Sequence, residues 1–218
     1  MPLPDLPGGA GFGAFVERVA ERSYGTAFCM FREADPVLER AEAPAIRRAN
    51  ATAYLDARAG RAPLLLIGEA MGYAGGRFTG IAFTAERTLH GWGTPYEPTS
   101  MRPEGWAEQS GTIVHGALAA LGLEAETVLW NVVPAHPHRP GEPLSNRTPS
   151  VGELRAGAVV LGELIERLGP RALVAVGRSA ERALGELGLP SDACVRHPAN
   201  GGATAFRAGL ERYVVSAC

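Results

Sequence analysis

The sequence contains no lysine, only three cysteines, and no apolar run long enough to span a membrane. Without lysine, no side-chain amine can form a Schiff base, which excludes lyase reactions of that type. The cysteines, Cys29, Cys194 and Cys218, are odd in number, widely spaced and without a CxxC pair, so neither a disulfide framework nor a zinc site is expected. The N-terminus lacks the features of a secretory signal. We therefore expect reduced thiols, a cytoplasmic location and no membrane partner.

Charge is nearly balanced, with 21 arginines against 23 acidic residues and a formal net charge of −2. This is not the basic field expected of a protein that coats nucleic acid without specificity. Arginine binds phosphate through a bidentate fork, but a bias in the base composition of the gene explains the absence of lysine more simply. Composition therefore neither names nor excludes a nucleic-acid partner.

Four short apolar runs, each bounded by turn-forming residues, predict strands that are covered on both faces. They lie at 63–68, 127–133, 172–177 and 192–196. Helical periodicity is present at 12–20, 44–59, 108–121, 150–168, 179–187 and 203–215. Strands that alternate with helices of this length indicate crossover connections and a parallel sheet. We predict one α/β domain over 1–218, a three-layer α/β/α sandwich with a short, mostly parallel four-stranded sheet and a loop-like N-terminus over 1–13.

Polar or glycine-rich segments follow each predicted strand, at the edge where open parallel sheets bind their ligands. The first is GEAMG at 68–72, where the glycines let bare backbone approach a ligand and Glu69 supplies a carboxylate. The loop that follows is rich in glycine but has neither the GxxxxGK[ST] nor the GxGxxG pattern. This disfavours a nucleoside-triphosphate or dinucleotide site.

Two other strand ends carry side chains suited to binding a base. The amide of Asn131 offers both a donor and an acceptor, which matches the O4 and N3–H groups on the edge of a uracil-like base. His197, fixed by the following proline, can donate a hydrogen bond to charge that develops on a leaving group. Taken singly, a carboxylate at a strand end is more often a helix cap or an ion-pair partner than a catalytic group, and an isolated asparagine or histidine there is structural as often as functional. His136 and His138, in a proline-rich loop, are expected to be exposed.

The order of the segments is more informative than any one of them. GEAMG, TGIAFT, WNVVP with NRTP, and RHPANGG, taken in this order, resemble the motifs of the uracil-DNA glycosylase superfamily. The likeness runs from Leu64 to Gly202 and is closest to the branch whose first motif is GE[AG]PG and whose second reads NVV, a proline-rich run and NRxP. It implies an enzyme that removes a damaged base from DNA.

The resemblance implies a role for each matching residue. Glu69 would position or activate the attacking water, and His197 would stabilise the negative charge on the departing base. Phe83 would stack on the base, with Phe78 the less favoured choice, and Asn131 would read the base edge. The remaining pocket residues would be Gly68, Ala70 and Met71. The residues that approach the DNA backbone would be Arg147, Gly201 and Gly202.

The sequence also departs from the pattern of this branch. Met71 stands where the branch has proline, which loosens a turn that proline would hold. The [4Fe–4S] cluster of the branch needs four cysteine ligands, whereas this chain has three scattered cysteines and Ala135 at one ligand position. No cofactor or metal is therefore expected. Segment 199–202 has no serine-rich or apolar wedge to fill the vacated base stack, which leaves the substrate range open.

We therefore expect a monomeric, monofunctional DNA glycosylase that acts in base excision repair, with DNA containing uracil or another deaminated base as its partner. Two alternatives stay open. One is a protein of the same fold that binds uracil-containing or damaged DNA without cutting it, and the other is a hydrolase of free nucleosides or nucleotides. The sequence does not choose among uracil, hypoxanthine and xanthine.

Overall fold

The computed structural model describes residues 11–61 and 63–217, so residues 1–10 of the predicted N-terminal loop lie outside the described residues. The sheet has four strands, all parallel, in the order β2-β1-β3-β4. Their bounds are Leu64–Ala70 for β1, Thr127–Val133 for β2, Ala172–Val176 for β3 and Ala193–Val195 for β4. Each strand coincides with a predicted one, and the predicted α/β fold class is confirmed.

Helices precede, link and follow these strands. Their bounds are α1 (Gly13–Glu21), α2 (Ala43–Asp56), α3 (Gly76–Thr79), α4 (Glu86–Trp92), α5 (Gln109–Ala120), α6 (Val151–Leu168), α7 (Arg178–Glu186) and α8 (Ala203–Ala217), with a 3₁₀ turn, η1, at Glu124–Glu126. The helical periodicity predicted all of these except α3, α4 and η1. The three missed elements span two turns or fewer, which is too short for an apolar repeat to show.

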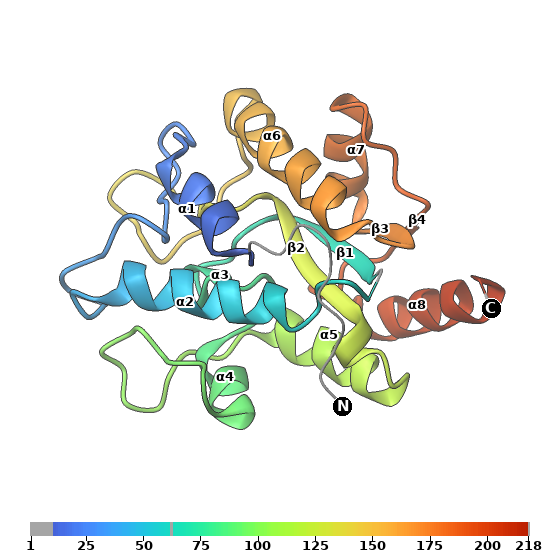
Figure 1. The fold of residues 1–218 in the computed structure, drawn as a ribbon, viewed down its shortest axis with the longest axis horizontal. Coiled ribbons are helices and arrows are strands. Elements are labelled where there is room, and N and C mark those ends of the chain that lie inside the picture. Colours follow the sequence, from blue (N-terminus) through green and yellow to red (C-terminus); the bar gives the residue numbers. More distant parts are fainter. Residues whose placement is uncertain (1–10, 62, 218) are drawn as a thin grey trace.

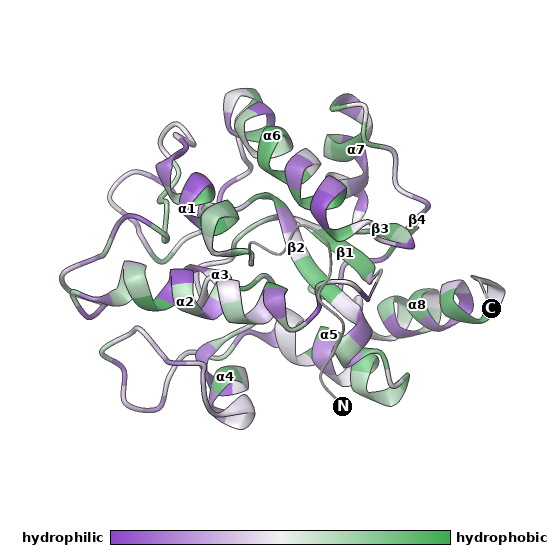
Figure 2. Ribbon diagram, viewed as in Figure 1, coloured by the Kyte–Doolittle hydropathy of each residue, from purple (hydrophilic) through white to green (hydrophobic). Residues whose placement is uncertain are grey.

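Helices cover both faces of the sheet (Figure 1). On one face α6 contacts β2 and α7 contacts β1 and β3; on the other, α8 contacts β4 and packs beside α5. The strands between them are largely hydrophobic, whereas the helices mix hydrophobic and hydrophilic residues (Figure 2). Within the described segments, no helix combines the length and the apolar character needed to cross a membrane.

Strand β2 forms an edge of the sheet, and helix α2 satisfies part of its backbone. The Tyr54 hydroxyl accepts a hydrogen bond from the Leu129 N–H at 2.9 Å and donates one to the Thr127 carbonyl at 3.3 Å. A buried edge strand needs such partners because its outward N–H and C=O groups have no neighbouring strand. Tyr54 therefore holds α2 against the sheet.

Helix α6 begins with a capping box and lies close against β2. The Ser150 hydroxyl accepts a hydrogen bond from the Glu153 N–H, and the Glu153 carboxylate accepts one from the Ser150 N–H at 2.7 Å. At Gly157, a Cβ atom would lie 2.0 Å from the Val132 carbonyl oxygen. Glycine is therefore required for α6 to approach the end of β2 this closely.

Buried ion pairs join α2, α3 and the loop that precedes α2. Glu39, in that loop, lies 3.0 Å from the guanidinium of Arg47 in α2 and 3.3 Å from that of Arg77 in α3. All three side chains are at most 1% exposed. Arg77 also pairs with Asp35 at 3.0 Å, and Arg47 donates to the Met30 carbonyl at 2.6 Å. This cluster positions the loop that follows β1.

Replacing Glu39 with glutamine should leave two buried guanidinium groups without their shared carboxylate. Removing one partner of a buried ion pair costs about 3–5 kcal/mol, so the free energy of unfolding of Glu39→Gln, measured by urea titration, should fall by about that amount. Glu104→Gln is the matched control, because Glu104 pairs with Arg102 on the surface; it should leave the unfolding midpoint unchanged. Equal midpoints for the two variants would contradict this account.

Candidate active site

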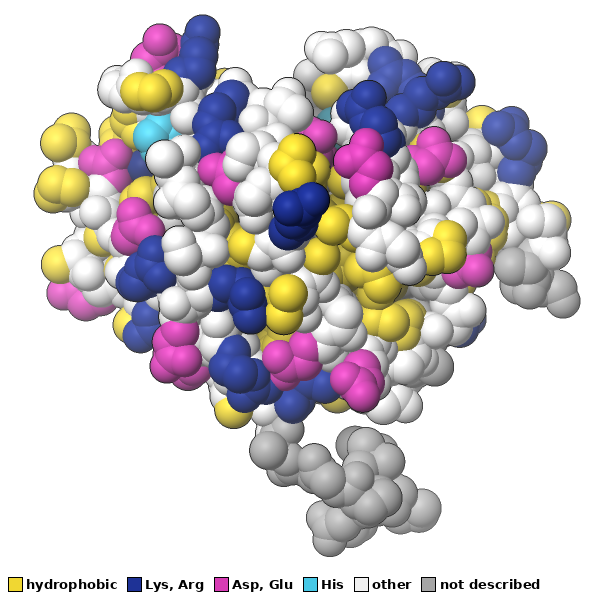
Figure 3. Space-filling view, turned by 90° about the horizontal axis from the view of Figure 1, so that it is seen from above, with side chains coloured by type: hydrophobic (Ala, Val, Ile, Leu, Met, Phe, Trp, Pro, Cys, Tyr) yellow, Lys and Arg dark blue, Asp and Glu magenta, His cyan; other side chains and the backbone are white. Residues whose placement is uncertain are grey.

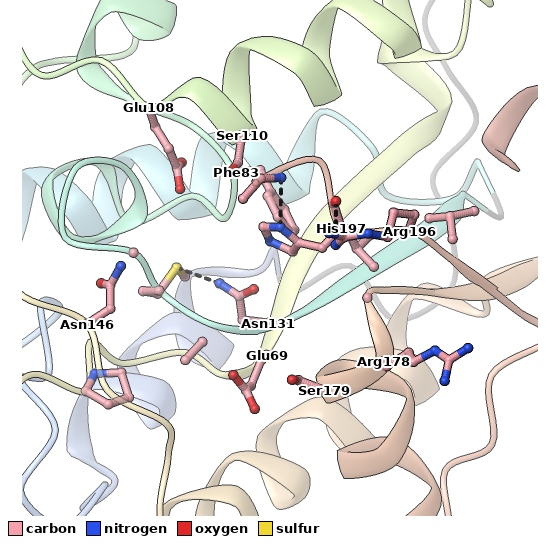
Figure 4. Close-up of a pocket in the computed structure, with 18 of the residues that line it drawn as sticks. Glu69, Phe83, Glu108, Ser110, Asn131, Asn146, Arg178, Ser179, Arg196 and His197 are labelled. Atoms are coloured by element: carbon pink, nitrogen blue, oxygen red, sulfur yellow. Dashed lines mark hydrogen bonds between the residues drawn. The ribbon is translucent and has the colours of Figure 1, made fainter. Parts of the chain in front are cut away.

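A pocket of about 750 Å³ opens beside the carboxyl ends of the strands (Figure 4). All four strands contribute to it directly or through the segment that follows them. The predicted residues that line it are Glu69, Ala70, Met71, Phe83, Asn131, Arg147 and His197. The structure therefore brings together side chains that are separated by as many as 128 positions in the chain.

Gly68 lies behind the pocket wall and lets two of its residues approach each other. A Cβ atom at Gly68 would lie 2.3 Å from Oδ1 of Asn131 and 2.6 Å from Cζ of Phe83. Strand pairing sets Gly68 directly opposite Asn131. Gly68 is therefore required at this position because any side chain would displace the Asn131 amide or the Phe83 ring.

Phe83 presents its ring to the pocket from an unfavourable backbone conformation. Its φ angle is +53°, in the left-handed region that residues other than glycine, asparagine and aspartate rarely adopt. Such a conformation costs about 1–3 kcal/mol and persists only where the surroundings enforce it. The ring is 7% exposed and lies 6.1 Å from the His197 ring, centroid to centroid. Phe78, by contrast, is buried against Trp106 outside the pocket.

The Asn131 amide is buried and is held by a weak partner. Its Nδ2 donates a hydrogen bond to the Met71 sulfur at 3.1 Å. A thioether is a poor acceptor, so a carbonyl oxygen that enters the pocket would be a better partner for the same N–H. Met71 itself is buried, and its own N–H donates to the Ala135 carbonyl at 3.2 Å.

Glu69 and Ala70 end β1 at the mouth of the pocket, and both are half-buried. Burial raises the pKa of Glu69 above its usual value, while the nearby guanidinium of Arg182 acts in the opposite direction. The carboxylate lies on the same side of the pocket as the hydroxyl of Ser179, at the start of α7 (Figure 4). A water molecule here would have a basic group and a hydroxyl within one cleft.

The surroundings of His197 favour the neutral form of its imidazole. Burial lowers its pKa, and the charge of Arg196 lowers it further. Its Nδ1 accepts a hydrogen bond from the Ala199 N–H at 3.1 Å, so the proton of the neutral ring is on Nε2. Gly202 supports this arrangement, because a Cβ atom there would lie 2.0 Å from the His197 carbonyl oxygen. Neither Gly202 nor the exposed Gly201 lines the pocket, and their predicted contact with DNA stays a prediction.

Arg147 has internal partners. Its guanidinium lies 2.6 Å and 2.8 Å from the two carboxylate oxygens of Glu153 and donates to Thr26 at 2.9 Å. The pKa of Glu153 is held below its usual value by this pairing, against the opposing effect of burial. Arg147 therefore joins the loop after β2 to α6, and its predicted contact with the DNA backbone stays a prediction.

The expectation that His136 is exposed is wrong. Its side chain is fully buried, with Nδ1 2.9 Å from the Met71 carbonyl oxygen, and burial lowers its pKa to about 4. The Phe28 and His136 backbones also form an antiparallel bridge, which draws this loop inward. His136 thus supports Met71 from behind. The ring of His138 is half-buried and stacks on the ring of His136.

Among the pocket residues that were not predicted as site residues, Glu108 is the one whose side chain is left without a partner. It lies immediately before α5, and its side chain points into the pocket (Figure 4). Its Oε2 atom is buried and has no hydrogen-bond partner, and burial raises the pKa of the carboxyl to about 7. No motif marks this position. The signal in the sequence was the glycine-rich loop, because Gly72 and Gly75 leave the space that this carboxyl fills.

The thiols do not fit an iron–sulfur cluster. Cys29 is buried, Cys194 is exposed in β4, and Cys218 lies outside the described residues, so four cysteine ligands cannot converge. Within residues 11–61 and 63–217, no group of three or more histidine, cysteine or acidic side chains is arranged to hold a metal ion.

The surface of the molecule on the side of α6 and α7 carries both arginine and acidic side chains (Figure 3). The two kinds are interspersed, and this face has no broad basic field.

Comparison with known proteins gives a family and a fold. A family model described as the uracil DNA glycosylase superfamily matches residues 56–215. The crystal structure of wild-type SMUG2 from Pedobacter heparinus is similar in fold, with a TM-score of 0.62 and 15% sequence identity over 95% of this chain and 97% of that one. No curated protein matches the chain. Because the family model covers most of the chain and all four motifs, the chain belongs to the uracil-DNA glycosylase superfamily.

Proposed function

We propose that the protein is a monofunctional DNA glycosylase that flips uracil, or a related deaminated base, out of DNA and hydrolyses its N-glycosidic bond. The observation that carries the proposal is the convergence of Glu69, Phe83, Asn131 and His197 on one pocket. The proposal includes a role in base excision repair, action as a monomer and a cytoplasmic location.

The pocket can recognise a flipped pyrimidine by stacking and by hydrogen bonds to its edge. The base would stack on Phe83, whose ring is held in place by its backbone and by Gly68. The Asn131 amide would exchange its weak bond to the Met71 sulfur for the uracil O4 and would accept from N3–H. Cytosine presents an amino group and an unprotonated N3 at the same positions, so this amide orientation disfavours it.

Hydrolysis requires a donor at the leaving base and a water near the sugar. The Nε2–H of neutral His197 can donate to O2 as the C1′–N1 bond breaks and its electron pair passes to the base. Such a preorganised donor lowers the barrier by about 2.7–4 kcal/mol. The Glu69 carboxylate can stabilise the positive sugar and take a proton from the water whose oxygen bonds to C1′.

His197→Ala should reduce single-turnover cleavage of a uracil-containing oligonucleotide about 100-fold to 1000-fold, because the donor to the leaving base is lost. Cleavage is read as abasic sites that alkali converts to strand breaks. The matched control, His90→Ala, removes an exposed histidine outside the pocket and should cleave like the wild type. If the wild type bound the oligonucleotide without cutting it, the protein would be a binder of damaged DNA; activity on free nucleosides alone would indicate the hydrolase alternative.

The pH dependence of the single-turnover cleavage rate should reflect the protonation of Glu69. Because its pKa is raised, the carboxylate becomes protonated at a higher pH than an exposed glutamate, whose usual pKa is 4.5. Single-turnover cleavage should therefore fall with decreasing pH while the pH is still above 4.5. Glu69→Gln should be slower by about 100-fold or more and should lack this acid limb. The limb should persist in His197→Ala. A wild-type profile that stays flat down to pH 4.5 would show that Glu69 is not the titrating base.

A further inference from the structure

Glu108 is placed in the pocket by the absence of side chains around it. A Cβ atom at Gly75 would lie 2.1 Å from its Oε2, and one at Gly72 would lie 3.0 Å from its Oε1. A Cβ at Gly111, in the first turn of α5, would lie 3.3 Å from Oε2. Three glycines thus surround this carboxyl, and substitution at Gly72 or Gly75 would displace it.

One oxygen of this carboxyl has no hydrogen-bond partner within the described part of the chain. The buried Oε2 accepts and donates no hydrogen bond, although an unpaired buried polar group is destabilising. The catalytic roles argued above also leave Glu108 unused. Because its pKa is raised to about 7, a large share of the carboxyl is neutral near neutral pH and can donate as well as accept. An unpaired buried group that points into a pocket is typical of a ligand contact.

The hydrogen bonds to the bound base determine which position of its ring faces Glu108. Around a uracil ring the order of positions is O2, N3, O4 and C5. His197 would bind O2, and Asn131 would bind N3–H and O4, with its Nδ2 directed to the Met71 side of the pocket. Position C5 comes next, on the side away from His197. Gly72 follows Met71 in the chain, and the Glu108 carboxyl lies against Gly72.

We propose that Glu108 is a specificity-determining residue that hydrogen-bonds a polar substituent at C5 of the flipped pyrimidine, so that the pocket accepts 5-hydroxymethyluracil as well as uracil. The assignment of base edges in this inference rests on the proposed function. A hydroxymethyl group can both donate to and accept from the carboxyl, whichever protonation state it has. The methyl group of thymine can neither donate nor accept a hydrogen bond, and it would exclude water from the carboxyl while leaving the carboxyl without a partner. The same contact therefore disfavours thymine.

The test compares single-turnover cleavage of matched duplexes that carry uracil, 5-hydroxymethyluracil or thymine. In Glu108→Leu, the rate on 5-hydroxymethyluracil relative to uracil should fall about fivefold to tenfold, the size of one lost neutral hydrogen bond. Glu108→Gln, which keeps a donor and an acceptor, should hold the ratio within about twofold of the wild type. Glu104→Leu, a surface control, should not change it. An unchanged ratio in Glu108→Leu would overturn the proposal.

Two further measurements separate this inference from other failures. Melting temperatures show whether Glu108→Leu is folded: removal of an unpaired buried carboxyl should leave the midpoint unchanged or raise it. A lower midpoint with an equal loss of both cleavage activities would show a structural role and overturn the inference. Calorimetric titration with free 5-hydroxymethyluracil and free uracil tests Glu108 without catalysis. If no duplex is cut but Glu108→Leu still weakens binding of 5-hydroxymethyluracil relative to uracil, the proposed hydrolysis fails while the role of Glu108 stands.

Discussion

The site depends on the close packing of Asn131 and Phe83 against the bare backbone of Gly68. Strand β1 is flanked by β2 and β3, and its register sets Gly68 opposite Asn131. The absence of a side chain at Gly68 then lets the amide and the aromatic ring meet at one wall of the pocket. Because β3 and β4 end at the same edge, their following segments bring Ser179 and His197 to the same pocket. Recognition and chemistry therefore share one sheet edge.

The pocket concentrates unfavourable local features that the rest of the fold stabilises. Phe83 has a positive φ angle, and the buried Oε2 of Glu108 is unpaired. Each costs of the order of 1–3 kcal/mol, which is a substantial fraction of the stability of a typical domain. The buried pairs of Glu39 with Arg47 and Arg77, together with a continuous apolar core, hold the loop after β1 in place. Such features are tolerated at sites where a ligand uses them.

The departures from the related branch have structural counterparts. Met71, in place of proline, supplies a sulfur acceptor for the Asn131 amide, and its carbonyl lies next to buried His136. The N-terminal region is joined to the rest of the domain by packing and by a hydrogen bond. Phe15 of α1 lies 5.8 Å from Trp130 of β2, centroid to centroid, and Thr26 accepts a hydrogen bond from Arg147.

The sequence by itself determined the four strands, the longer helices and the residues at the strand ends. These depend on local signals: continuous apolar runs, helical periodicity and short motifs in order. Only the tertiary structure decided which side chains are partners. The burial of His136 and the entry of Glu108 into the pocket arise from contacts between segments distant in the chain. The pairing of Arg147 with Glu153 depends on how the loop after β2 folds back on α6, and the short helices α3 and α4 carry no apolar repeat. Local patterns do not encode such contacts, because burial and charge pairing are properties of the packed chain.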